Sequence, residues 1–135
     1  MAKTNFIKKW DGKVLEDWGS SVSKEFSTFQ NAMKREVGRI AKEIGAELVS
    51  FHKGHNDCSW FVKRNGHYVY GSYSVLGVRS MVCLTEETQQ GSFLSVYCRT
   101  AEHEKDYRGG CNNNCYFEDV QDVMDRLLNE EHRRV

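Results

Sequence analysis

The chain has 135 residues, 28% of them charged and 39% hydrophobic, and its 19 basic residues balance its 19 acidic ones. This length and composition predict one globular domain with a single core rather than a disordered chain. The zero net charge argues against a general nucleic-acid binder, which normally carries a basic surplus to neutralise phosphates.

Targeting and redox signals predict a cytoplasmic protein. No apolar run in the sequence reaches the length that a signal peptide or a membrane span needs, so we expect a cytoplasmic protein without membrane contact. The five cysteines are an odd number, which in a reducing compartment favours free thiols or a metal site over a disulfide framework.

The first 45 residues predict an arm and a long helix. Residues 1–20 mix lysines with apolar residues, and we expect an N-terminal arm that packs Trp10 and Trp18 on the body, with one helical turn over 14–18. Residues 21–44 predict an amphipathic helix, because apolar residues recur at spacings of three and four. Gly45 suits the left-handed position after a helix end. The predicted buried stripe is Val22, Phe26, Phe29, Met33, Val37, Ile40 and Ile44.

The period then changes from 3.6 to two, which predicts a sheet over 46–99 that begins with a strand at about 46–53. Asn65-Gly66 predicts a hairpin between 59–64 and 67–70, because both residues accept the positive φ angles of a type I′ turn. This turn opposes Val62 to Val69 and Phe61 to Tyr70, and directly opposed residues share a face. One predicted face carries Trp60, Val62 and Val69, and the other carries Phe61, Lys63, Tyr68 and Tyr70.

The rest of the chain predicts two more strands and a closing helix. The strands are expected at 80–84 and 93–99, a polar loop at 100–115, and the helix at 117–133 with acidic residues in its first turn. The fold class is therefore α+β: an N-terminal helix, an antiparallel meander of about five strands and a C-terminal helix, with the helices packed on one face.

The second face of this sheet is the first candidate site, because it gathers aromatic side chains beside cations. Its members are Phe61, Tyr68, Tyr70 and Tyr97 with Lys63 and Arg99, and Phe93 extends the set. If nothing covers these rings they form an exposed patch, which suits a protein interface or the stacking of single-stranded nucleic acid. The alternative is that the N-terminal arm covers them, or a second copy of the chain in a homodimer.

The polar loop is the second candidate. Cys98, His103, Cys111 and Cys115 supply ligand types that zinc accepts, but only Cys111 and Cys115 have the close spacing of structural sites, and the strand alternation turns Cys98 into the core. The set His103, Cys111 and Cys115 is thus a weak zinc candidate against unliganded cysteines, and we expect no other cofactor.

Other loop residues support simple structural interpretations beside functional ones. His103, flanked by acidic residues, is the only candidate acid/base for an enzyme, and a solvated charged loop is the favoured alternative. Gly109-Gly110 predicts a turn with positive φ, and Asn112-Asn113-Asn114 predicts turn conformations and a cap for the last helix. We expect the remaining histidines at the surface: His52, His55, His67 and His132.

Several short runs in the last third carry a resemblance. They are Tyr97-Cys98-Arg99-Thr100-Ala101, Lys105-Asp106-Tyr107, Gly109-Gly110, and Asn112-Asn113 followed by an acidic helix. In these runs the chain resembles small accessory proteins of Gram-positive bacteriophages and conjugative elements, among which are anti-CRISPR inhibitors and other counter-defence proteins. The resemblance implies a small non-enzymatic binder.

The predicted function is therefore an inhibitor of a bacterial nuclease, such as a CRISPR effector, that acts through protein contacts. The aromatic face and the loop would form the interface, with acidic groups mimicking phosphate and Arg99, Tyr107 and Arg108 as anchors. The end of the preceding strand and the loop supply Arg99, Glu102, Glu104, Asp106, Tyr107 and Arg108 to this set. The alternatives are a single-stranded nucleic-acid-binding module that uses the aromatic face and, behind it, a small enzyme with His103 as acid/base.

Overall fold

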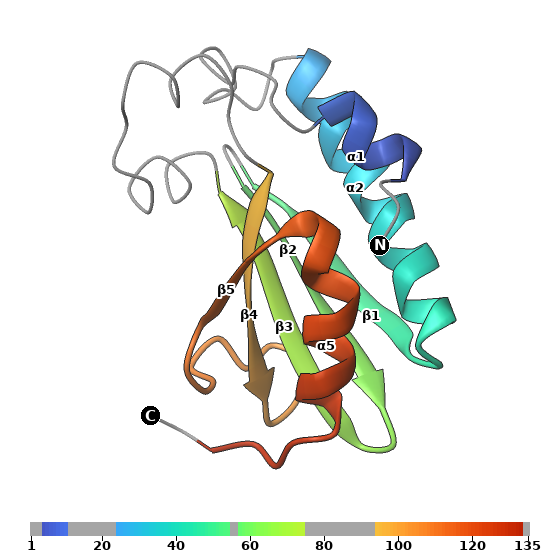
Figure 1. The fold of residues 1–135 in the computed structure, drawn as a ribbon. Helices are drawn as coiled ribbons and strands as arrows, with labels where there is room; N and C mark the ends of the chain where they lie inside the picture. Colours follow the sequence, from blue (N-terminus) through green and yellow to red (C-terminus); the bar gives the residue numbers. More distant parts are fainter. Residues whose placement is uncertain (1–3, 11–23, 55–56, 75–93, 134–135) are drawn as a thin grey trace.

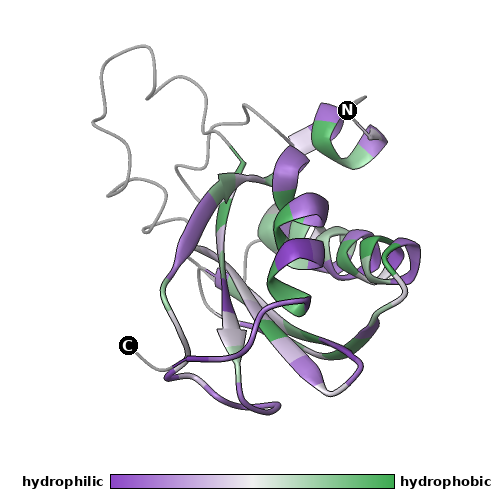
Figure 2. Ribbon diagram, turned by 60° about the horizontal axis from the view of Figure 1, so that its bottom comes forward, coloured by the Kyte–Doolittle hydropathy of each residue, from purple (hydrophilic) through white to green (hydrophobic). Residues whose placement is uncertain are grey.

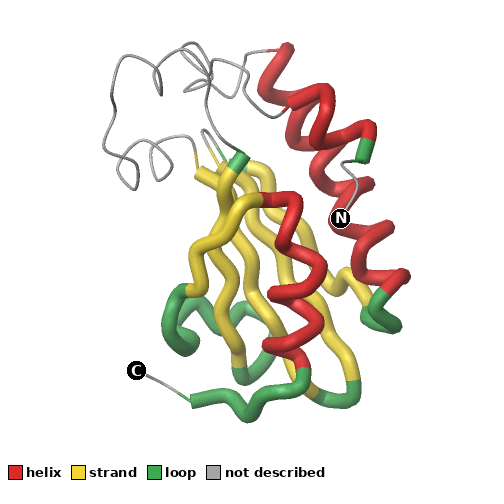
Figure 3. The backbone as a smooth tube through the Cα atoms, viewed as in Figure 1, coloured by secondary structure: helices red, strands yellow, loops and turns green. Residues whose placement is uncertain are grey.

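The computed structural model describes residues 4–10, 24–54, 57–74 and 94–133. Five antiparallel strands form one sheet in the order β1-β2-β3-β4-β5, and three α-helices pack on it (Figures 1 and 3). The elements are α1 (Asn5–Trp10), α2 (Lys24–Glu43), β1 (Glu47–Lys53), β2 (Asp57–Arg64), β3 (His67–Ser74), β4 (Ser95–Ala101), β5 (Asn113–Tyr116), the 3₁₀ turn η1 (Phe117–Asp119) and α5 (Val120–Leu128). The α+β class, the five-stranded meander and the helices at both ends are as the sequence predicts.

The helices lie on one face of the sheet and enclose the main core. Figure 2 shows each long helix divided between hydrophobic and hydrophilic stripes, as expected for a helix with one buried side. The predicted stripe of α2 is confirmed from Phe26 to Ile40, all of them at most 3% exposed. Val120, Met124, Leu127 and Leu128 of α5 close the same core from the other end.

The end of α2 follows from Gly45. This residue has a φ of 69°, which glycine adopts without a steric penalty. The amide of Gly45 donates to the Lys42 carbonyl (3.1 Å) and that of Ala46 to the Ala41 carbonyl (2.8 Å), so the chain leaves the helix in a Schellman motif. The sequence prediction for this position is confirmed.

The β2–β3 hairpin has the predicted turn and register. Asn65 and Gly66 have φ angles of 52° and 79°, and Val62 pairs with Val69 and Phe61 with Tyr70. Trp60, Val62 and Val69 enter the core beneath the helices, while Phe61 and Tyr70 belong to a second, smaller cluster on the opposite face. The turn therefore separates two sets of buried side chains.

The N-terminal and C-terminal boundaries differ from the prediction. Residues 5–10 form the helix α1 rather than an arm, with Phe6, Ile7 and Trp10 buried, whereas Trp18 and residues 14–18 lie outside the described part. The last helix ends at Leu128 rather than near 133, because the amides of Asn129 and Glu130 turn back to Arg126 and Leu127 and the chain then leaves the helix axis.

The C-terminal half of the sheet also differs. The predicted strand 80–84 and residue Phe93 lie outside the described residues, and the fifth described strand is β5, which the prediction left within the polar loop. The loop is therefore shorter, from Glu102 to Asn112. Asn113 and Asn114 pair with β4 instead of capping the helix, since a polar run gives no periodic signal for a four-residue strand.

No helix in the described ranges is long and apolar enough to cross a membrane.

Two glycines give opposite predictions for the free energy of unfolding. A Cβ at Gly71 would lie 2.2–2.4 Å from the indole of Trp60, so Gly71→Ala should destabilise the protein by about 2–3 kcal/mol. A Cβ at Gly38 would meet only Leu48 at 3.8 Å, so Gly38→Ala in α2 should stabilise it by about 0.5–1 kcal/mol. Urea denaturation of both variants measures the two effects, and equal shifts would contradict this packing.

Candidate functional site in the loop between β4 and β5

The second face of the sheet is covered by the loop of the same chain. Phe61 is 2% and Tyr70 8% exposed, so of the two alternatives left open by the sequence these two rings follow the covered one. The ring of Tyr107 packs edge-on against both, with centroid distances of 5.5 and 5.8 Å. Trp10 instead packs against Phe29 in the helix layer, so it does not cover this face.

Arg99 completes this arrangement, which we call the Tyr107 cluster: Phe61, Tyr70, Tyr97, Arg99 and Tyr107. The Arg99 guanidinium lies 4.6 Å from the ring centre of Tyr70 and 5.8 Å from that of Tyr97, within the range of cation–π attraction. Its Nη2 donates a 2.8 Å hydrogen bond to the backbone carbonyl of Tyr107. Burial raises the pKa of the Tyr70 phenol, so this ring stays neutral beside the cation.

Asp106 holds the backbone of the loop. Its side chain is 2% exposed, and its two oxygens accept hydrogen bonds from the amides of Glu102 (2.8 Å) and Arg108 (3.1 Å). The Asp106 amide donates to the His103 carbonyl at 3.1 Å, which closes a turn with Lys105 at a φ of 74°. Asp106 is thus a structural residue, and the prediction that its carboxylate is part of an exposed interface is wrong.

Gly109 and Gly110 allow close packing of the loop; the predicted positive φ angles are not found at either residue. A Cβ at Gly109 would lie 2.3 Å from the Thr100 carbonyl oxygen, and one at Gly110 would lie 2.8 Å from the Thr100 hydroxyl. The Gly110 amide donates to the Thr100 carbonyl at 3.1 Å. The loop therefore lies directly on the end of β4, and neither glycine is among the residues with positive φ in the described part of the chain.

Tyr107 projects from this supported loop. Although its backbone and one edge of its ring are held, its side chain is among the most exposed large hydrophobic ones described, with 57% of the residue exposed. In the same loop Glu102, Lys105 and Arg108 are exposed, and Glu104 is half-buried. Tyr68, which lies beside Lys63, and Tyr97 are partly buried at the margin of the same face.

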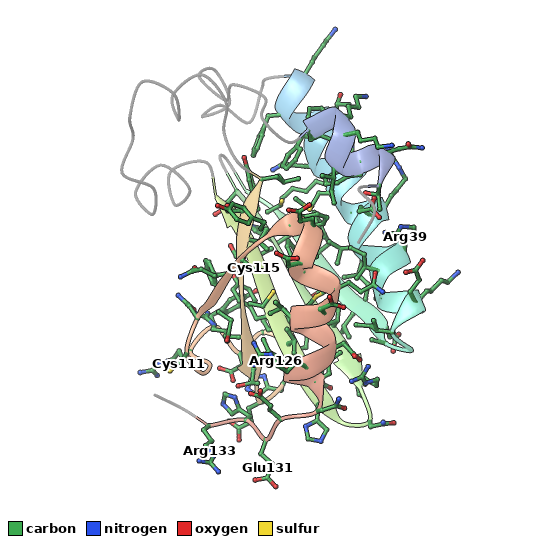
Figure 4. All side chains as sticks on the ribbon, viewed as in Figure 1. Arg39, Cys111, Cys115, Arg126, Glu131 and Arg133 are labelled. Carbon is green, nitrogen blue, oxygen red and sulfur yellow. The ribbon has the colours of Figure 1, made fainter. Side chains whose placement is uncertain are left out.

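A cleft of about 780 Å³ lies beside the loop, between β5, the end of α5 and the chain that follows it. Figure 4 shows Cys111 of the loop on one side of this region and Glu131 and Arg133 of the C-terminal segment below it. His103 is exposed and does not line the cleft, and its Nδ1 lies 2.6 Å from the neighbouring Glu104 carbonyl. The arrangement offers no support for His103 as an acid/base.

His132 is the residue that the sequence reasoning missed. It was expected at the surface, yet its side chain is only 16% exposed, with Nδ1 3.2 Å from the Thr100 hydroxyl and Nε2 3.6 Å from the Asp106 carboxylate. In the sequence, His132 is distinguished only by its position shortly after an amphipathic helix. That position does not indicate that it contacts Thr100 or Asp106.

The predicted zinc ligands do not come together. Among the described residues, one group of metal-ligand side chains has its ligand atoms within 4.8 Å of one another, and it is Glu102, Asp106 and His132 rather than His103, Cys111 and Cys115. Cys111 is exposed, whereas Cys115 lies against Cys98 across the β4–β5 pair. The hydrogen bond from the Cys98 thiol lowers the pKa of Cys115, and together with burial it raises that of Cys98.

The chain was compared with protein-family models, with curated proteins and with solved structures, and none of the three comparisons finds a match. The site is therefore interpreted from its own geometry.

Removal of the Asp106 carboxylate should loosen the loop. Asp106→Ala leaves the two amides without their acceptor and should lower the free energy of unfolding by about 1–3 kcal/mol. Asp106→Asn keeps one acceptor oxygen and should lose less. Glu104→Ala, in the same turn, should change stability by less than about 0.5 kcal/mol. Urea denaturation ranks the three, and an equal loss in all would contradict the role of Asp106.

The thiols should differ in reactivity. Cys111 is exposed and the pKa of Cys115 is lowered, whereas burial raises the pKa of Cys58 and leaves its thiol protonated and inaccessible. Iodoacetamide at neutral pH should modify Cys111 and Cys115 in the native protein and Cys58 only after urea unfolds the chain. Peptide mapping by mass spectrometry reads each site, and early modification of Cys58 would disprove its burial.

Proposed function

We propose that this chain is a non-enzymatic protein-binding module whose contact surface is the loop from Glu102 to Asn112. The observation that carries the proposal is Tyr107, a ring that is 57% exposed on a backbone held by Asp106 and Arg99. A large side chain that is fixed before binding loses little conformational entropy when a partner covers it.

The surroundings of Tyr107 fit a protein partner. Tyrosine and arginine are enriched among the residues that dominate binding energy, and Arg108 is the exposed neighbour of Tyr107. The loop also exposes the charges of Glu102 and Lys105, and a polar, charged rim is typical of protein interfaces. The buried residues Phe61, Tyr70 and Asp106 support this surface instead of contacting the partner.

We further propose that the partner is a bacterial nuclease, such as a CRISPR effector, and that the chain acts in the bacterial cytoplasm as an accessory protein of a mobile element. The resemblance of residues 97–113 to such proteins supports this step. The carboxylates of Glu102 and Glu104 suit a basic nucleic-acid channel, because charge complementarity steers association and selects partners.

No specific observation favours the alternatives. Single-stranded nucleic acid would need open rings for stacking, and Phe61 and Tyr70 are covered by Tyr107. The same cover argues against a homodimer that uses the rings of Phe61 and Tyr70.

Tyr107→Ala should weaken partner binding at least about tenfold, because it removes the anchor and leaves the supporting residues in place. Tagged wild-type protein should capture a nuclease from lysate of a Gram-positive host after the nucleic acid is digested, and Tyr107→Ala should not. Calorimetry with the purified nuclease then measures the dissociation constants, and a cleavage assay measures inhibition.

Tyr116→Ala is the matched control. Tyr116 is also an exposed tyrosine (52%), but it lies at the end of β5 that is away from the loop. Thermal denaturation shows whether each variant is folded. Equal binding by wild type and Tyr107→Ala, or capture that depends on nucleic acid, would refute the proposed interface.

A further inference from the structure

We propose that Glu102, Asp106 and His132 form a binding site for one divalent transition-metal ion, with Zn²⁺ as the probe. The site shares Glu102 with the proposed contact surface, but the argument for it does not rest on the protein-binding function. It joins the β4–β5 loop to the segment after α5, two parts of the chain that the sequence separates.

The ligand atoms already lie close together. One carboxylate oxygen from Glu102, one from Asp106 and a ring nitrogen of His132 are all within 4.8 Å of one another. His132 Nε2 and Asp106 Oδ2 are 3.6 Å apart, which is too long for a hydrogen bond. Two ligands on one zinc ion at about 2.0–2.2 Å each lie roughly 3.3 Å apart, so this pair needs only a small contraction.

The imidazole gives an independent observation. His132 Nε2 is buried and has no hydrogen-bond partner, although it faces the Asp106 carboxylate. Nδ1 lies 3.2 Å from the Thr100 hydroxyl. In the tautomer that is protonated at Nδ1, this nitrogen donates to the hydroxyl oxygen and Nε2 carries the lone pair. A cation between that lone pair and the Asp106 carboxylate would relieve their repulsion. Metal-binding histidines are commonly oriented in this way by a contact at the other ring nitrogen.

The donor set decides the class of ion. One imidazole nitrogen with two carboxylates suits zinc and similar borderline ions, whereas Mg²⁺ and Ca²⁺ prefer oxygen ligands alone. The set contains no thiolate, which distinguishes it from a site built on Cys111 or Cys115. Three protein ligands also leave a coordination position for water or for another donor.

Titration of the metal-free protein with Zn²⁺ by calorimetry tests the proposal. One ion should bind per chain, and a hundredfold excess over the dissociation constant should raise the midpoint of thermal unfolding by about 5–10 °C. His132→Gln and Glu102→Gln should each weaken binding at least about tenfold. These two variants avoid the structural carboxylate of Asp106, so both are expected to fold.

His103→Gln and Cys111→Ser are the matched controls, because both residues belong to the same loop and neither is in the set. Both should bind Zn²⁺ as the wild type does. Co²⁺ substitution should give a spectrum without thiolate-to-metal charge transfer. No binding by the wild type would mean a histidine–carboxylate pair without metal. That outcome, binding retained in His132→Gln, or a thiolate band would each overturn the proposal.

Discussion

The turn at Asn65-Gly66 is the constraint on which both faces of the sheet depend. A two-residue loop allows one register, and side chains alternate between faces with a period of two, so a slip by one residue would exchange the faces. With the observed pairing, Val62 and Val69 meet the helices while Phe61 and Tyr70 meet the loop. The main core and the Tyr107 cluster are thus two consequences of one local geometry.

The two helices α2 and α5 are joined to the sheet at the turn end of the same hairpin, through Arg64 of β2. The Arg64 guanidinium donates to the Ile44 carbonyl after α2 at 2.7 Å and to the Asp125 carboxylate of α5 at 2.6 Å. Its other terminal nitrogen donates to the Asp125 carbonyl and to Asn129, each at 3.0 Å. Trp60 contacts Met124 of α5 from the middle of β2, with Gly71 leaving room for its indole. The position of α5, and with it the segment that carries His132, therefore follows from the hairpin.

The sheet face opposite the helices supports the loop between β4 and β5. Its rings do not form a surface for a ligand, because Tyr107 and Arg99 pack on them. The same contacts hold Tyr107 in an exposed position, and the buried Asp106 fixes the backbone on both sides of it. An interface built on this loop would bind with a preformed anchor, while His132 connects the loop to the C-terminal segment.

The sequence by itself determined the features that rest on local periodicity and turn chemistry: the stripe of α2, its end at Gly45, the hairpin register and the two faces. It also marked the polar loop, predicted at 100–115, as a candidate site. Only the tertiary structure decided that β5 pairs with β4, that Tyr107 covers Phe61 and Tyr70, and that His132 lies 3.6 Å from Asp106. These features join residues far apart in sequence, and no local pattern records which distant side chain fills a given position.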